Sequence, residues 1–219
     1  MEFYNKNILL DKKVIDDVFS NFKNNPKMLV FGLGYDSRMW YEGNNKNTFF
    51  VEDKQEFIDL NTKYISIDNI IKYKYNTTVN KSLSLSDEDI TKFELIDKLK
   101  QLGPFDIIIV DGPEGYNNDK PGRLIPCYWA TLLSKKGTII YIDDANRNLE
   151  NYCIKKYFAD KQITEFIGRT KCSKIIYWFT IIIKYIIIYI YYLRLRGLLK
   201  AFWGPYIYNK YYYLHNKYE

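Results

Sequence analysis

Apolar and polar residues follow two different periods along this chain, and segments of the two kinds alternate. Short apolar runs are typical of strands buried on both faces, and they predict strands at residues 28–31, 48–51, 105–110 and 138–142, while the alternation at residues 70–75 predicts a further strand. Helical spacing of apolar positions predicts helices at residues 8–25, 36–43, 54–61, 88–102, 124–134 and 149–159. Residues 163–167 and 174–181 are predicted to pair as an antiparallel hairpin at the sheet edge.

This alternation indicates an α/β fold. We expect a Rossmann-like, mostly parallel sheet of seven strands, with helices on both faces and the antiparallel hairpin at its end. The chain divides by pattern into three parts: an N-terminal helical segment at residues 1–26, a main domain at 27–182, and a basic, aromatic C-terminal extension at 183–219.

Composition narrows the class of protein. The apolar fraction of 47% is enough for a sizeable core. Cys127, Cys153 and Cys172 are widely spaced and form neither a disulfide framework nor a zinc pattern, so a reducing, cytoplasmic setting is expected. The single histidine, His215, gives little support to catalysis by a Cys–His or Ser–His–Asp arrangement. The first residues do not resemble a signal peptide.

The net charge of +6 is concentrated near the C-terminus. Residues 171–218 contain eight lysines and arginines and no acid, whereas residues 1–170 are close to neutral. A basic face for binding nucleic acid is therefore not expected on the main domain.

Four predicted strands end in residues suited to binding or catalysis. These strand ends are Gly32-Leu33-Gly34, Glu52-Asp53, Asp111-Gly112-Pro113 and Asp143-Asp144. In parallel sheets, ligands bind beyond the carboxyl ends of the strands, where such residues meet. The sequence therefore predicts a site at this edge.

Gly32 and Gly34 allow a tight turn and a close approach of the backbone to a ligand. The third glycine of the dinucleotide fingerprint is missing, and Ser37 lies nearby instead, which disfavours a pyrophosphate cofactor. A nucleoside without phosphates, such as S-adenosylmethionine, tolerates the shorter pattern. An ordinary tight turn explains the glycines equally well.

Glu52 stands about 20 residues after the glycines, where an acid can accept hydrogen bonds from both ribose hydroxyls of a nucleoside. Asp53 is the alternative for this role. The competing interpretation is a solvated carboxylate at a strand end.

Asp111, Asp143 and Asp144 end two strands that we expect to be neighbours. They can take a proton from a substrate hydroxyl, bind a cofactor amine, share a proton, or hold a divalent cation, with Asp111 and Asp144 as its ligands. Because successive strand residues face opposite ways, only one of Asp143 and Asp144 is expected to face the site. Asp111 can also cap a turn. Arg123 and Arg147 can each fork a substrate carboxylate or lie on the surface.

Taken together, these motifs resemble those of the plant-type glucuronoxylan 4-O-methyltransferases. The resemblance spans about residues 27–160. The matching blocks are residues 29–40, 48–53 and 106–116, the last continuing to Pro121-Gly122-Arg123, with a looser match at 143–147 and Glu150. It implies a class I methyltransferase fold that binds S-adenosylmethionine and methylates a sugar hydroxyl of a glycan or polysaccharide, glucuronic acid in the plant enzymes.

The resemblance, together with the motifs described above, suggests roles for individual residues. The cofactor would be held by Gly32, Gly34, Asp36, Ser37, Glu52, Asp53 and Asp111. The sugar would be held by Tyr35, Gly115, Tyr116, Arg123 and Arg147, and catalysis would rest on Asp111, Asp143 or Asp144. Two departures concern the acceptor: Tyr35 stands where the family has histidine, and Asp143 replaces the histidine of a His-Asp-Val-Asp-Arg block.

The C-terminal extension leaves several alternatives open. Residues 175–193 are strongly apolar but contain Lys184, and basic and apolar residues alternate from Arg194 to Trp203. Packing on the domain or in a homodimer, contact with a membrane surface, and a membrane span are the three interpretations. The alternative function, motivated by Tyr35 and the altered block at residues 143–147, is a membrane-associated interaction protein that retains the fold without turnover. A nicotinamide dehydrogenase is a more distant alternative.

Overall fold

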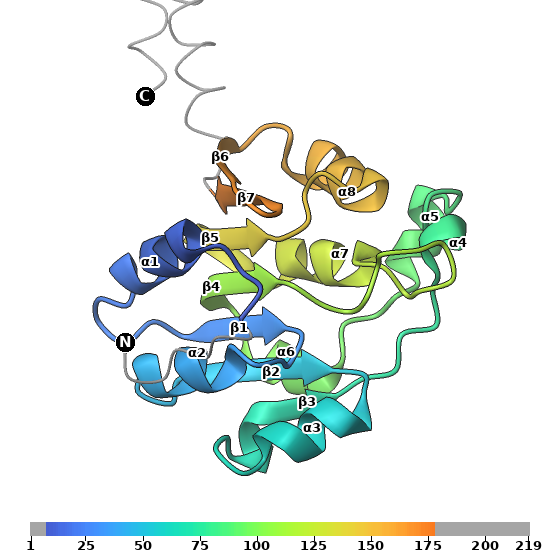
Figure 1. Ribbon diagram of the computed structural model, residues 1–219. Coiled ribbons are helices and arrows are strands. Elements are labelled where there is room, and N and C mark those ends of the chain that lie inside the picture. The colour runs from blue at the N-terminus through green and yellow to red at the C-terminus, as the bar shows by residue number, and fades with distance from the viewer. Residues whose placement is uncertain (1–7, 178–219) are drawn as a thin grey trace, which may run out of the picture. The chain divides into compact units, whose positions relative to one another are not determined.

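The central sheet of the computed structural model, which describes residues 8–177, has seven strands in the order β3-β2-β1-β4-β5-β7-β6 (Figure 1). The strands are β1 (Met28–Phe31), β2 (Thr48–Glu52), β3 (Ile70–Lys72), β4 (Phe105–Val110), β5 (Ser134–Ile142), β6 (Gln162–Ile167) and β7 (Lys171–Ile176). The first five are parallel, and β7 runs antiparallel to both β5 and β6. The predicted fold class, a Rossmann-like, mostly parallel sheet of seven strands with a terminal antiparallel hairpin, is confirmed.

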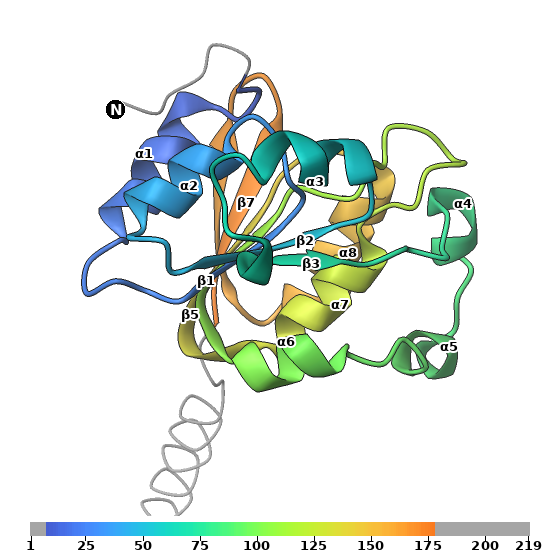
Figure 2. The ribbon, with the colours of Figure 1, turned by 90° about the horizontal axis from the view of Figure 1, so that it is seen from below.

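Helices cover both faces of the sheet, with α1, α2 and α3 on one side and α6, α7 and α8 on the other (Figure 2). Their bounds are α1 (Lys12–Ser20), α2 (Ser37–Gly43), α3 (Gln55–Asn61), α4 (Val79–Ser82), α5 (Asp87–Thr91), α6 (Asp97–Leu102), α7 (Leu124–Leu132) and α8 (Asn148–Phe158), and a 3-10 turn, η1, spans Ile67–Asn69.

Two apolar layers hold the helices to the sheet. Alternate residues of a strand point to opposite faces, so in β1 Met28 and Val30 pack with α1 and α2, while Leu29 and Phe31 pack with α7. All four residues of β1 are buried. Burial on both faces explains why the central strands are continuously apolar, and each fully buried side chain of this size contributes about 2 kcal/mol.

The N-terminal helix is shorter than predicted. It begins at Lys12 because the Asp11 side chain accepts the Lys13 N–H at 2.8 Å as a cap, and it ends at Ser20. Its buried face, which includes Val14 and Val18, packs against the sheet. The part boundary predicted at residue 26 stays a prediction, and the one at residue 182 lies outside the described residues.

The predicted helix at 88–102 is wrong in the middle, since α5 ends at Thr91 and α6 begins at Asp97. Between them, Phe93, Leu95 and Ile96 all pack against the core, which one straight helix face does not allow. In addition, the carbonyl of Phe93 accepts the indole N–H of Trp129 at 2.9 Å. Tertiary contacts therefore interrupt a segment of helical composition.

The hairpin of β6 and β7 forms at the sheet edge as predicted, although β7 begins at residue 171 rather than 174. Within residues 8–177, none of the helices has both the length and the hydropathy that a membrane crossing requires. The extension at 183–219, and with it the alternatives of membrane contact and dimerisation, lies outside the described residues.

Candidate active site

The carboxyl ends of β1 and β4 approach each other through two glycines. Gly32 has a φ of +112°, and a β-carbon on Gly112 would lie 2.7 Å from the Gly32 Cα. No other residue type fits this contact without moving the backbone. The tight-turn interpretation therefore accounts for Gly32, and a ligand contact there stays a prediction.

Beyond β1, the next turn is closed by side chains of α2. The Gly34 N–H donates to Ser37 Oγ at 2.8 Å, and the Trp40 indole N–H donates to Asp36 Oδ2 at 2.8 Å. Burial raises the pKa of Asp36, and the hydrogen bond from Trp40 partly offsets that rise. Tyr35, in the same turn, is 49% exposed and is free to meet a ligand. The segment therefore presents one exposed aromatic ring above a fixed turn.

Glu52, the last residue of β2, connects two strand ends. Its Oε2 accepts the Leu33 N–H at 2.7 Å, and its Oε1 accepts the N–H groups of Asp53 and Lys54. Burial raises the pKa of Glu52 to about 7, against the effect of the Lys54 and Leu33 hydrogen bonds. The residue is 5% exposed, so it is not a solvated strand-end carboxylate. Asp53 is half-buried beside it.

Three carboxylates gather where β4 and β5 end. Oxygens of Asp111, Asp143 and Asp144 all lie within 4.8 Å of one another. The prediction that only one of Asp143 and Asp144 faces Asp111 is wrong, because β5 ends at Ile142 and Asp144 adopts a left-handed φ of +54°. The turn thus breaks the alternation that holds within a strand. Asp143 Oδ1 also accepts the Thr170 hydroxyl at 2.8 Å.

Arg123 is the cation of this cluster. Its Nη2 lies 3.1 Å from Asp111 Oδ1 and 2.9 Å from Asp144 Oδ2, and the side chain is 4% exposed. The guanidinium also donates to the main-chain carbonyls of Pro113, Asp111 and Asp143. Arg123 is therefore an internal bridge between two strand ends rather than a surface arginine, and its predicted contact with substrate stays a prediction.

Asp111 is the most accessible of the three acids, with a side chain 33% exposed against 10% for Asp144. Burial raises the pKa of Asp111 well above its ordinary value; Arg123 acts against this shift, and Asp143 and other carboxylates add to it. Asp144 Oδ2 is held by two arginines, since Arg147 Nη2 lies 2.8 Å away in addition to Arg123. The two acids thus differ in how many cations contact them.

The same acids can be tested as a divalent cation site. Three carboxylates offer the oxygen ligands that Mg²⁺ and Ca²⁺ take in proteins. However, the Arg123 guanidinium lies against one oxygen of Asp111 and one of Asp144, where such an ion would bind. The predicted ligands Asp111 and Asp144 therefore fit a metal only if Arg123 is displaced.

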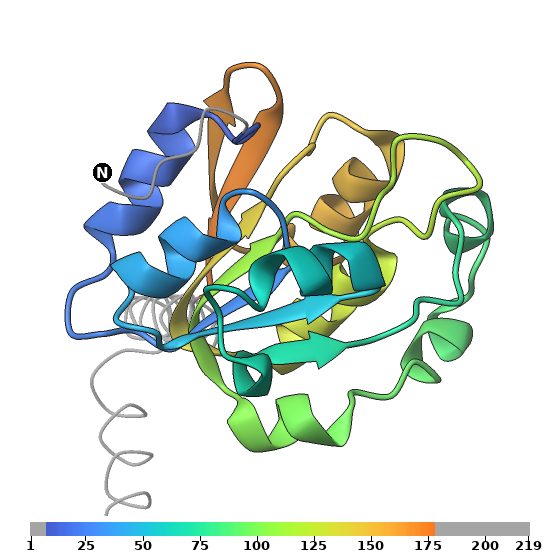
Figure 3. The same ribbon diagram turned by 60° about the horizontal axis from the view of Figure 1, so that its bottom comes forward.

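The loop from Glu114 to Gly122, called the 114–122 loop below, extends beyond the carboxyl ends of the strands. Its base is closed by the Gly122 N–H donating to the Glu114 carbonyl at 2.8 Å. The side that faces α4 is held by Val79 and Asn80, whose N–H groups donate to carbonyls of the loop (Figure 3). The loop is thereby fixed over the candidate site.

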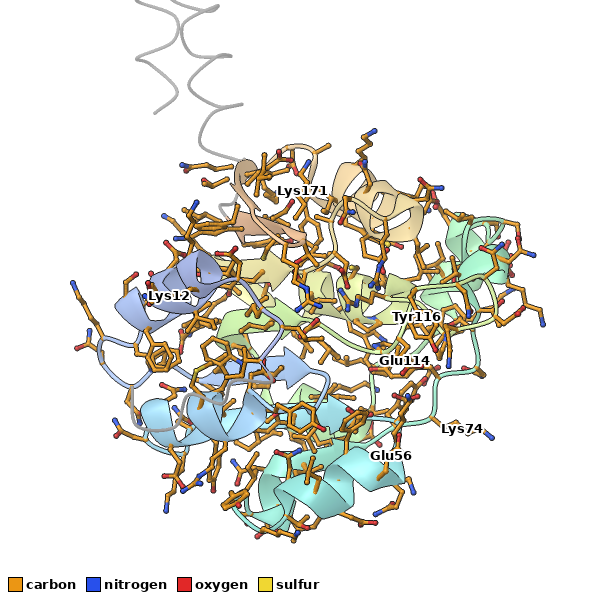
Figure 4. The ribbon with its side chains drawn as sticks, viewed as in Figure 1. Lys12, Glu56, Lys74, Glu114, Tyr116 and Lys171 are labelled. Carbon is orange, nitrogen blue, oxygen red and sulfur yellow. The ribbon has the colours of Figure 1, made fainter. Side chains whose placement is uncertain are left out.

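Charged and aromatic side chains line this loop. Glu114 pairs with Lys54, which follows β2, and with Lys120 at 2.7 Å. Lys120 lies 5.0 Å above the ring of Tyr116, which is 61% exposed. Glu114 and Tyr116 lie on the side to which the strand arrowheads point (Figure 4). Tyr116 therefore lies on the same side of the sheet as the strand-end acids, and the role of Gly115 and Tyr116 as acceptor ligands stays a prediction.

Sequence reasoning did not single out Glu150, Lys54 or Lys120 as site residues. Glu150 is in the first turn of α8, where a glutamate usually caps the helix in solvent, but here it is 0% exposed. The spacing Arg147-x-x-Glu150 in the looser matching block was the available signal. For the two lysines, only the pairing with Glu114 across the sheet edge reveals their place.

The sheet order defines a Rossmann-like α/β protein with the strand arrangement that the predicted class I methyltransferase fold requires. Known sequences agree with this class. The chain is 30% identical over 190 residues to glucuronoxylan 4-O-methyltransferase 3 from Arabidopsis thaliana. This match covers 75% of this chain and 61% of that protein. It is 26% identical over 168 residues to arabinogalactan O-methyltransferase 2 from the same plant, covering 64% and 57%.

The resemblance to the glucuronoxylan 4-O-methyltransferases is confirmed by these matches, and the chain spans about three fifths of the length of the curated relatives it matches. No protein-family model matches the chain. The solved structure of an O-methyltransferase from Bacillus cereus in complex with SAH is 15% identical, with a TM-score of 0.46, and the match covers 77% of this chain and 82% of that one.

Proposed function

We propose that this chain is an S-adenosylmethionine-dependent O-methyltransferase that acts on a sugar hydroxyl of a polysaccharide. The observation that carries the proposal is the convergence of Asp111, Asp143 and Asp144 within 4.8 Å at the edge where Glu52 and the Gly32–Gly34 turn also lie. Sequence similarity to polysaccharide O-methyltransferases supports the class of acceptor.

Glu52 is the proposed ribose ligand, since its ionised oxygens have lone pairs left for hydroxyl donors beside the main-chain N–H groups they accept. Gly32, Gly34, Asp36 and Ser37 form the turn against which the rest of the nucleoside lies. When bound, S-adenosylmethionine supplies a methyl group on a sulfonium, which a hydroxyl oxygen can attack directly. The carboxylates beside it favour the positive charge of that group.

Asp111 is the proposed general base. It ends β4, is one-third exposed, and contacts a single cation, whereas Asp144 is held by two arginines. With S-adenosylmethionine bound, Asp111 would accept the proton of the acceptor hydroxyl whose oxygen takes the methyl group. Tyr116 and Tyr35 offer exposed rings to the sugar, and most of the rate comes from holding the two reactants in line.

Calorimetry with S-adenosylmethionine tests the cofactor, and methyl transfer to glucuronoxylan or arabinogalactan tests the acceptor. We expect saturable heat and a raised melting temperature for the wild-type chain, because a ligand that binds only the folded state stabilises it. Absence of both at millimolar ligand would rule the proposal out. Cofactor binding without transfer to either polysaccharide would favour the alternative of a non-catalytic interaction protein, which the loss of the two family histidines at Tyr35 and Asp143 motivates.

If a divalent cation takes part, Asp111 and Asp144 are its proposed ligands. It would add charge beside the acceptor hydroxyl and make that hydroxyl easier to deprotonate. Since Arg123 already supplies a positive charge at this point, we treat the cation as an addition that a chelation experiment decides.

A further inference from the structure

Glu150 is the least satisfied charged group in the described part of the chain. It is 0% exposed, and neither carboxylate oxygen has a hydrogen-bond partner among residues 8–177. Burying an unpaired carboxylate is costly, and native proteins keep such a group only where something compensates it. The contacts of Glu150 in this structure therefore do not account for its burial.

The nearest cations belong to the candidate site. Burial raises the pKa of Glu150, while the charges of Arg123 and Arg147 are among the influences that act against that rise. A β-carbon on Gly115 would lie 3.1 Å from Glu150 Oε1 and 3.7 Å from Arg147 Nη1. Gly115 thus borders both groups and leaves the space between them free of a side chain.

The arginines are distributed unevenly. Both Arg123 and Arg147 contact the same oxygen of Asp144, at 2.9 Å and 2.8 Å, while Glu150 has neither. Arg123 is anchored by three main-chain carbonyls and is 4% exposed. Arg147 is 30% exposed and precedes α8, the helix that carries Glu150 three residues later. Of the two arginines, Arg147 is the one that can change partner.

From this arrangement we infer that Glu150 is a positioning residue and the second partner of Arg147. When ligands occupy the strand ends, the Arg147 side chain moves from Asp144 to Glu150. It then donates to the carboxylate oxygens of Glu150, and Asp144 keeps Arg123 as its partner. Asp144 can then accept a hydroxyl of the acceptor sugar beside Asp111. The functional consequence rests on the proposed methyltransferase activity, whereas the competition between Asp144 and Glu150 for Arg147 does not.

The competition is tested on the protein without ligands, by comparing the change in melting temperature that Glu150→Gln causes in the wild type and in the Asp144→Asn variant. In the wild type, Glu150→Gln removes an unpaired buried charge, so we expect the melting temperature to rise by at least 2 °C, on the order expected for about 0.5 kcal/mol or more. In the Asp144→Asn background, Arg147 pairs with Glu150, so the same substitution lowers the melting temperature. Adding Arg147→Met to that background restores the rise.

An equal effect of Glu150→Gln in the wild-type and Asp144→Asn backgrounds would overturn the inference. Glu165→Gln is the matched control, since Glu165 lies on exposed β6 paired with Lys171, and its effect should not depend on the background.

Kinetics provides the second measurement, which also serves if Asp144→Asn does not fold. Glu150→Gln should lower kcat at least tenfold with the KM for S-adenosylmethionine unchanged within twofold, because Arg147 then stays on Asp144. A variant with wild-type kcat would contradict the positioning role. A wild-type protein with no turnover would refute the proposed function instead, and the melting experiment would still decide the competition for Arg147.

Discussion

Gly112 packs so closely on Gly32 that a β-carbon at position 112 would lie 2.7 Å from the Gly32 Cα and 3.0 Å from its nitrogen. This contact holds together the ends of β1 and β4. The Gly32–Gly34 turn follows β1, and Asp111, the proposed base, follows β4. The Asp111 N–H donates to the Phe31 carbonyl at 3.0 Å just beside it. The distance between the cofactor turn and Asp111 is therefore set by a pair of residues without side chains.

We expect Gly112→Ala to destabilise the fold by about 2–4 kcal/mol, because the added methyl meets backbone atoms that cannot rotate away. Urea unfolding followed by circular dichroism measures the change. Gly34→Ala is the control, since its β-carbon would lie 3.4 Å from Asp36 Oδ1, an ordinary contact, and should cost less than about 1 kcal/mol. Equal stability of both variants would contradict the proposed cause.

Cofactor affinity should depend on pH through Glu52, whose pKa burial raises to about 7. Ribose hydroxyls need the ionised carboxylate, which predominates above that pH. Binding of S-adenosylhomocysteine, measured by calorimetry, should therefore strengthen about tenfold between pH 6 and pH 8. Glu52→Gln should bind weakly at every pH, whereas Glu56→Gln, exposed on α3, should keep the wild-type profile.

The same shift has a consequence of opposite sign for stability. A carboxyl whose pKa is raised from 4.5 to about 7 on folding stabilises the folded state below pH 4.5, and this contribution is lost as the pH rises through 7. The free energy of unfolding of the wild type, measured by urea titration, should fall between pH 4.5 and pH 7.5. This decrease should be smaller in the Glu52→Gln variant, which lacks the titrating carboxyl. A fall of the same size in the variant would assign it to other groups.

Arg123→Met should destabilise the fold by about 3–5 kcal/mol, because it leaves Asp111 and Asp144 close together without their shared cation. Mn²⁺ should raise the melting temperature of this variant and leave that of the wild type unchanged, since the guanidinium occupies the ion's position there. Arg169→Met, at an exposed turn, is the control. A wild-type melting temperature that rises with Mn²⁺ and falls with a chelator would show that the resident cation is a metal.

Asp111→Asn should abolish methyl transfer while the fold survives, because the amide cannot accept the hydroxyl proton. Asp144→Asn should also reduce turnover, through loss of the acceptor contact. Asp59→Asn, exposed on α3, should retain wild-type activity. Full activity of both Asp111→Asn and Asp144→Asn, measured with a polysaccharide acceptor, would remove these residues from the mechanism.

The strands and their ends were largely predictable, because a strand buried on both faces must be continuously apolar. Met28–Phe31 and residues 107–110 are such runs, and Gly32 after the first and Asp111 after the second mark where the apolar layer stops. Short helices were less predictable. The segment 92–96 has helical composition, yet its apolar residues pack into the core. The Phe93 carbonyl accepts a hydrogen bond from Trp129.

The sequence by itself determined the α/β alternation and the acids that end the strands, since these depend on hydrophobic period and on where each apolar run stops. Only the tertiary structure decided how the charges are paired. Arg123 pairs with Asp111 and Asp144, and Glu150 lies buried beneath the 114–122 loop, because these groups meet across loops whose packing leaves no periodic trace in the sequence. The left-handed turn at Asp144, which places both Asp143 and Asp144 beside Asp111, is likewise a property of the folded chain.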